Sequence, residues 1–144
     1  MQDHYRKLER MYLSANINQD LFDTTTIKIA DRSSEIGLTI DQKYFHALGA
    51  IHGSVYFKLL DDAAFFAVNS IVTDVFVLTK SFELEFKRPV NKGQLKSVGT
   101  VVESKADSFI AEAKLYNEVG KIVAHGSGTF VKSKVALTPE IGYQ

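Results

Sequence analysis

The sequence contains no cysteine among its 144 residues. This absence excludes disulfide bonds, a zinc site built on thiolates and a cysteine nucleophile, and it is compatible with a reducing cytosol. The four histidines are scattered along the chain and form no close cluster with Asp or Glu, so we expect no metal site.

The sequence also lacks an excess of charge of either sign and a long apolar run. Lys and Arg total 17, and so do Asp and Glu, which gives a net charge of zero with neutral histidines. We therefore expect neither nucleic acid nor a membrane as the main partner. No stretch has the ~20 apolar residues of a membrane span, and the N-terminus lacks the apolar core of a secretory signal. These features favour a cytoplasmic location.

The chain length favours one domain, residues 1–144, with a single hydrophobic core. Apolar residues spaced between charges in residues 1–22 predict an amphipathic helix that ends near Asn16 and packs on the outside of this domain. We expect His4 to be solvated and the tail Pro139–Gln144 to be frayed.

Six segments show the alternation or the β-branched residues that are typical of strands. They are residues 24–30, 35–40, 75–87, 94–104, 108–117 and 121–134. Short connections between the last three segments predict an antiparallel meander. In the last strand, Gly126 and Gly128 suggest that something large lies against it, most simply the central helix.

The central helix is predicted from Val55 to Asn69, a segment without Gly or Pro that has apolar side chains on nearly every face. Such a helix must be covered, so we expect an α+β fold with one antiparallel sheet of about six strands wrapped around it. The far face of the helix still needs a cover. A second copy of the chain would supply it, so we expect a homodimer, with a dimer of dimers as the larger assembly.

Two carboxylates, Asp61 and Asp62, lie on this helix, where an unpaired charge would be costly. We expect Asp61 to be catalytic, the alternative being an ion pair with Lys58 on the same helical face. Asp62 is expected to form a salt bridge or a cap.

Gly53 and Ser54 lie where the helix begins, and the free N–H groups there suit an oxyanion that develops on a carbonyl. About 12 Å of helix separate this end from Asp61, too far for one guest to contact both within one subunit. A shared site would therefore need two subunits.

Four short motifs together carry a family resemblance. They are His52–Ser54, residues 59–63, Phe86–Val90 with Gly93, and Gly126–Phe130. With them the chain resembles, over about residues 35–133, the hotdog-fold acyl-CoA thioesterases of the 4-hydroxybenzoyl-CoA thioesterase superfamily, in the PaaI-type branch. The Asp that this family places nine positions after the motif histidine matches Asp61.

The resemblance implies hydrolysis of an acyl-CoA thioester without a metal or an organic cofactor. The N–H of Gly53 would polarise the thioester carbonyl, and Asp61 from the other subunit would act as general base or nucleophile. Thr79 matches a hydroxyl residue that assists in this branch. His46 replaces the family's Asn and keeps a donor and an acceptor, while Ser54 replaces its second Gly.

Further candidates for contacts with the substrate are His52, Ser54, Phe57, Phe65, Arg88 and Lys92. His52 is expected to have a mainly structural role, through a hydrogen bond in its loop. The two phenylalanines could line an acyl channel or fill the core. Arg88 and Lys92 could contact the phosphates of CoA or be ordinary surface charges.

Two other functions stay open. A hotdog dehydratase of acyl thioesters would place its acid fourteen positions after a histidine, but that position after His46 is Leu60, and the loop lacks the usual proline. A non-catalytic acyl-CoA-binding protein would be compatible with the altered positions His46 and Ser54.

Overall fold

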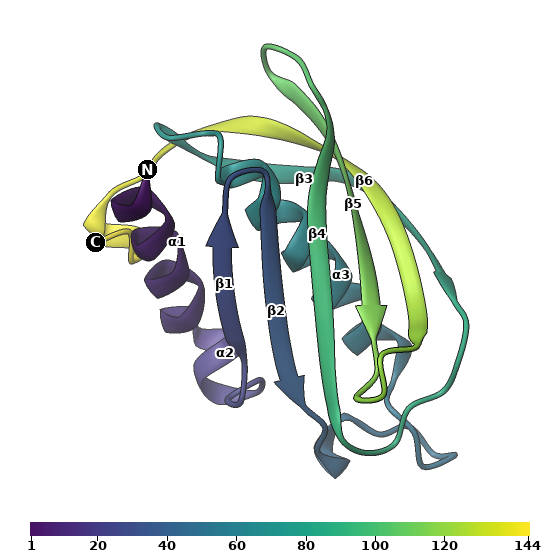
Figure 1. The fold of residues 1–144 in the computed structure, drawn as a ribbon. Coiled ribbons are helices and arrows are strands. Elements are labelled where there is room, and N and C mark those ends of the chain that lie inside the picture. Colours follow the sequence, from purple (N-terminus) through teal and green to yellow (C-terminus); the bar gives the residue numbers. More distant parts are fainter.

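A six-stranded antiparallel sheet curves around one long helix in the computed structural model, which describes all 144 residues (Figure 1). The elements follow in the order α1 (Gln2–Ser14), α2 (Asn16–Asp20), β1 (Thr26–Ala30), β2 (Ser33–Thr39), η1 (Gln42–Tyr44), α3 (Gly53–Asn69), β3 (Val75–Phe86), β4 (Gln94–Ser104), β5 (Ser108–Tyr116), β6 (Ile122–Ala136) and η2 (Pro139–Ile141). The predicted α+β arrangement is confirmed, and each expected strand is present with ends within two residues of the prediction.

The strands lie in the order β1-β2-β4-β5-β6-β3. Strands β4, β5 and β6 form the predicted meander, because each pairs with the next. Strand β3 precedes them in the chain but pairs with β6 at the far side of the sheet. One edge of β3 therefore has no strand beside it. The ladder between β3 and β6 skips Lys80, which forms a bulge between Thr79 and Ser81.

Helix α3 is buried by the sheet along most of its length. Its closest approach is to β4, where a Cβ on Gly99 would lie 2.2 Å from the carbonyl oxygen of Ala63. Only glycine leaves room for the helix backbone at this point. Neither α3 nor any other helix is long and apolar enough to cross a membrane.

The expectation that Gly126 and Gly128 make room for the central helix is wrong. A Cβ at these positions would lie 2.7 and 2.5 Å from the ring of Phe82 on the neighbouring strand β3. The Phe82 ring also contacts Phe57 of α3 edge to face, with the ring centroids 5.5 Å apart. The two glycines therefore make room for an aromatic side chain that packs between β3, β6 and α3.

Residues 1–22 form two helices, α1 and α2, where one was expected. The backbone at Ala15 is extended, with φ −61° and ψ 139°, and this ends α1. Helix α1 lies beside β1 at the edge of the sheet (Figure 1) and buries Leu8 and Tyr12. The segment lies outside the sheet, and its inner face forms part of the hydrophobic core.

The predictions of a solvated His4 and a frayed C-terminal tail are wrong. His4 is buried, with Nε2 at 2.8 Å from the carbonyl oxygen of Asn69 and Nδ1 at 2.7 Å from the hydroxyl of Tyr143. The tail forms the short turn η2, and Gly142 after it lies against α1. Figure 1 shows both termini close together beside α1. His4 thus ties the two ends of the chain to the C-terminal end of α3.

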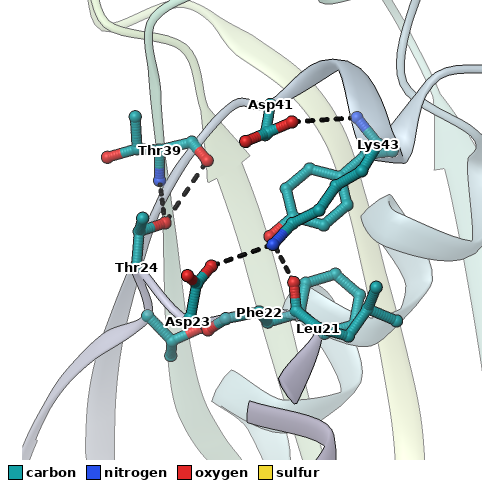
Figure 2. A network of polar contacts seen from close by, with 9 residues as sticks. Leu21, Phe22, Asp23, Thr24, Thr39, Asp41 and Lys43 are labelled. Carbon is teal, nitrogen blue, oxygen red and sulfur yellow. Dashed lines mark hydrogen bonds and ion pairs between the residues drawn. The ribbon is translucent and has the colours of Figure 1, made fainter. Parts of the chain in front are cut away.

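Polar contacts hold the connection between α2 and β1 against the loop that leads into α3 (Figure 2). The Nζ of Lys43 lies 3.0 Å from a carboxylate oxygen of Asp23, and the hydroxyl of Tyr44 donates a 2.8 Å hydrogen bond to the carbonyl of Leu21. The ion pair is exposed and contributes little stability. The contacts nevertheless fix where the loop before α3 begins.

Candidate functional site

Asp61 lies half-buried in the middle of α3 and faces strand β3. Its Oδ1 accepts a 2.9 Å hydrogen bond from the hydroxyl of Thr79. Burial raises the pKa of the Asp61 carboxyl from 3.8 to about 6, against the lowering effect of the Thr79 hydrogen bond. A carboxyl with this pKa is mostly ionised at neutral pH and is a better proton acceptor than an ordinary aspartate.

Asp62 is engaged within the chain. Its Oδ2 lies 2.7 Å from the Nζ of Lys58 and accepts a 2.7 Å hydrogen bond from the hydroxyl of Tyr12. The predicted salt bridge of Asp62 is confirmed, and the alternative pairing of Lys58 with Asp61 does not occur. Of the two adjacent carboxylates, only Asp61 lacks a cationic partner.

A hollow of about 730 Å³ lies beside Asp61 and Thr79. Phe65 lines it and packs against Phe76, with ring centroids 5.1 Å apart. Most of the other residues that line the hollow were not predicted from the sequence, and these include the residues from the two ends of the chain. No local pattern in the sequence shows that these ends reach the central helix.

Gly53 is the first residue of α3, so its N–H has no acceptor within the helix. His52 caps the helix: its Nδ1 accepts the N–H of Ser54 at 3.0 Å, and its carbonyl accepts the N–H of Val55 at 3.0 Å. The hydrogen bond that was expected of His52 in its loop is thereby confirmed. None of the cap or loop hydrogen bonds uses the N–H of Gly53. This N–H is available to an oxyanion at the positive end of the helix dipole.

A second hollow, of about 420 Å³, adjoins Gly53. The ring of Phe86 lies against Gly53, because a Cβ there would be 3.2 Å from the ring. His46 lines the same hollow, and its Nδ1 accepts the N–H of Leu48 at 3.1 Å. In the neutral ring the proton is therefore on Nε2, which can donate to a bound group.

The structure divides the predicted catalytic residues into two groups. Asp61 and Thr79 share the larger hollow, whereas Gly53 and His46 share the smaller one. Phe65 belongs to the first group and Arg88 to the second. The two hollows have no lining residue in common.

The remaining predicted substrate contacts lie outside both hollows. His52 and Ser54 bond to each other at the start of α3. Phe57 packs against Phe82 and is 40% exposed. Lys92 lies in a separate depression next to Glu118.

The raised pKa of Asp61 predicts that the stability of the fold depends on pH. Because the folded-state pKa lies above 3.8, folding favours the protonated carboxyl, so stability is lost as pH rises through about 6. Asp61→Asn keeps an acceptor for the hydroxyl of Thr79 and removes the free-energy cost of burying an ionised carboxylate. We expect its Tm to equal that of wild type below pH 3.8 and to exceed it by roughly 2–5 °C above pH 7. Calorimetry across this range tests it; a difference in Tm that stays constant with pH would contradict the burial of this charge.

Comparison with known proteins places this geometry in a family. The family model described as the thioesterase superfamily matches residues 48–124. No curated protein matches the chain. Three solved structures with a similar fold, each below 25% identity, illustrate the likeness.

The PaaI protein from the phenylacetic acid degradation operon of E. coli has a TM-score of 0.84 and 18% identity over 95% of this chain and 98% of its own. A conserved protein of Pseudomonas aeruginosa has a TM-score of 0.78 and 23% identity, over 86% of this chain and 98% of its own. A mutant of the phenylacetic acid degradation protein PaaI from Thermus thermophilus has a TM-score of 0.72 and 20% identity, over 83% of this chain and 100% of its own.

The helix wrapped by an antiparallel sheet is the hotdog fold that was expected from the resemblance to PaaI-type thioesterases. The residues matched by the family model include all of α3, with both Gly53 and Asp61. The chain belongs to the thioesterase superfamily.

Proposed function

We propose that this protein hydrolyses an acyl-CoA thioester to the free acid and CoA, at a site formed by two subunits of a homodimer. The observation that carries the proposal is one helix with a free amide at its first residue, Gly53, and a cation-free carboxyl of pKa about 6 at Asp61. The amide of Gly53 can donate a hydrogen bond to an oxyanion, and the carboxylate of Asp61 can act as a base. The reaction needs no metal and no organic cofactor.

The two groups belong to different subunits in this proposal. Eight residues of helix, about 12 Å, separate Gly53 from Asp61, and they line different hollows. The free edge of β3 offers a place for a second copy. Leu78 and Phe86 on this strand are 49% and 58% exposed, which a dimer interface would cover.

The ladder of β3 supports a particular register. Thr79 contacts Asp61, and Phe86 contacts Gly53. With the bulged Lys80 left out, Glu83 is the midpoint between Thr79 and Phe86. If two β3 strands pair antiparallel about Glu83, Thr79 of one subunit faces Phe86 of the partner subunit, on the helix side of the sheet. The same pairing brings Asp61 towards Gly53 of the partner subunit.

The proposed reaction has two forms. With Asp61 as general base, the carboxylate takes a proton from water, the water oxygen bonds to the acyl carbon, and the carbonyl oxygen becomes an oxyanion at the N–H of the partner's Gly53. The C–S bond then breaks, and the proton returns to the departing CoA sulfur. With Asp61 as nucleophile, its carboxylate oxygen bonds to the acyl carbon, the C–S bond breaks, and CoA leaves as a thiolate that takes a proton from water. Water then hydrolyses the resulting anhydride, which releases the free acid and restores the Asp61 carboxylate.

Other residues assist in the proposal. Thr79 holds Asp61 by its hydrogen bond, and the Nε2–H of His46 can donate to the thioester or to water beside Gly53. Arg88 lies at the same hollow and suits the phosphates of CoA. Lys92 lies in a separate depression, so we assign it no contact with the substrate.

A thiol-release screen of aryl, short, medium and long acyl-CoA thioesters tests the proposal. We expect at least one good substrate, whose kcat/KM rises with pH through about 6 as Asp61 ionises and levels off above pH 7. Light scattering should give the mass of a dimer or of a dimer of dimers. A monomer, or no thiol release from any thioester, would contradict the proposal.

A further inference from the structure

We propose that the hollow beside Asp61 holds the acyl group of the substrate, that it selects an uncharged apolar acyl group, and that the two ends of the chain form its outer wall. This inference rests on the proposed hydrolysis, because it places the acyl group next to the reacting carbon. It adds a substrate class and the residues that set it.

The walls of the hollow are mostly apolar. They include Met11, Ile17, Phe65, Phe76, Val135 and Ile141. A volume of about 730 Å³ lies within the usual range for pockets that enclose organic ligands. Asp61 and Thr79 lie on the same hollow, so an acyl group bound here has its carbonyl carbon within reach of the carboxylate.

Lys58 is the only cation on the hollow, and it is not free to bind an anionic acyl group. Its Nζ donates to the hydroxyl of Tyr12 at 3.1 Å, to Oδ1 of Asn18 at 2.8 Å and to Oδ2 of Asp62 at 2.7 Å. An ammonium has three N–H donors, and all three are used. Its charge is balanced by Asp62, while Asp61 adds a negative charge to the hollow.

A terminal carboxylate on the acyl group would therefore lose its hydration without gaining a cation or a donor in return. It would also approach Asp61 and Asp62, which repel it. An alkyl or aryl group of similar length faces neither cost, and the phenylalanine side chains favour it. The hollow therefore discriminates by the charge of the acyl group.

The outer wall depends on the ends of the chain, which lie outside residues 48–124 of the family match. Met11 and Ile17 come from α1 and α2, and Ile141 comes from the turn η2. These segments are held by the contacts of His4 with Asn69 and Tyr143. Substitutions in this wall should change which acyl groups fit and leave the Gly53 end unchanged.

The first test compares hexanoyl-CoA with adipoyl-CoA, which has the same length and a terminal carboxylate, and adds phenylacetyl-CoA to separate aryl from alkyl preference. Wild type should have a kcat/KM for hexanoyl-CoA about 100-fold or more above that for adipoyl-CoA, given the cost of burying an unpaired carboxylate. A ratio near one, or a preference for adipoyl-CoA, would overturn the inference.

Asp62→Asn gives a second test, because it leaves the charge of Lys58 unbalanced at the hollow. The preference for hexanoyl-CoA over adipoyl-CoA should fall by about tenfold or more as Lys58 gains affinity for the carboxylate. Use of the ratio cancels any change in the basicity of Asp61, which both substrates share. An unchanged ratio would show that Lys58 does not set the charge preference.

Ile17→Trp tests the outer wall of the hollow. Because Ile17 is 52% exposed, the variant should fold. It should lower kcat/KM for hexanoyl-CoA and phenylacetyl-CoA by about tenfold or more and leave acetyl-CoA within about threefold. The matched control is Ile110→Trp on β5, which lies away from the hollow and should change none of these values. Equal effects on acetyl and hexanoyl thioesters would overturn the assignment of the wall.

Binding of S-hexyl-CoA and S-(5-carboxypentyl)-CoA, thioethers that cannot be hydrolysed, separates the two proposals. We expect the hexyl compound to bind at least about tenfold more tightly. If it does so while no thioester is hydrolysed, the proposed hydrolysis fails and the acyl pocket stands. If thioesters are hydrolysed but the two thioethers bind equally, the pocket inference alone fails.

Discussion

Replacement of Asp61 by asparagine is expected to lower kcat for every thioester substrate by about 10³-fold or more, because the amide can neither accept the proton nor attack the acyl carbon. Asparagine has nearly the same shape and keeps an oxygen that accepts the hydrogen bond from Thr79, so the fold and the dimer should be retained. Thiol release under saturating substrate measures the effect.

Asp74→Asn is a suitable control, since Asp74 lies in the exposed connection between α3 and β3 and its side chain makes no hydrogen bond or ion pair. It should retain the activity of wild type. Full turnover by Asp61→Asn on any active thioester would remove this carboxyl from the reaction.

The second large effect is expected when the N–H of Gly53 is removed. Gly53→Pro eliminates this donor at the first position of a helix, where proline is tolerated because the N–H has no partner in the helix. His52 has φ −64° and ψ 146°, a backbone conformation that suits a residue before proline. We expect kcat to fall by about 10²–10³-fold, as for the loss of one oxyanion donor.

Gly53→Ala is the matched control, because it adds a Cβ and keeps the N–H. The Cβ would lie 3.2 Å from the ring of Phe86, a contact that a shift of a few tenths of an ångström relieves. The alanine variant should therefore lose less than about tenfold in kcat. Equal losses in the two variants would mean that steric fit at Gly53, and not its N–H, is what the reaction needs.

Several features could be predicted from the sequence because they follow from local periodicity. The strands follow from alternation and β-branched residues, and α3 follows from an uninterrupted apolar segment. The salt bridge of Asp62 with Lys58 could also be predicted, because the two residues are four positions apart on one helical face. Which of the two carboxylates pairs with Lys58 depends on the position of Tyr12, which contacts Asp62 from 50 residues away in the chain.

Long-range packing accounts for most of what was missed. The sequence does not indicate that β3 pairs with β6, because the chain passes from β3 directly to β4. The neighbour of Gly126 and Gly128 depends on this pairing, and so the ring of Phe82 was not expected there. His4 was expected at the surface because its partners, Asn69 and Tyr143, are 65 and 139 residues away in sequence.

A complementation experiment tests most directly whether the site is shared by two subunits. Asp61→Asn retains Gly53, and Gly53→Pro retains Asp61, so a mixed dimer has one site with both groups intact. With random reassortment from equal amounts, half of the dimers are mixed, and activity should recover to about a quarter of wild type.

The two variants should be refolded together or expressed together with different tags, and thiol release should be measured on the purified mixed dimer and on each parent. We predict that the mixed dimer has about half of the wild-type kcat per dimer, since one of its two sites is complete. If the mixed dimer is no more active than its parents, Gly53 and Asp61 do not act across the subunit interface, and the shared site is contradicted.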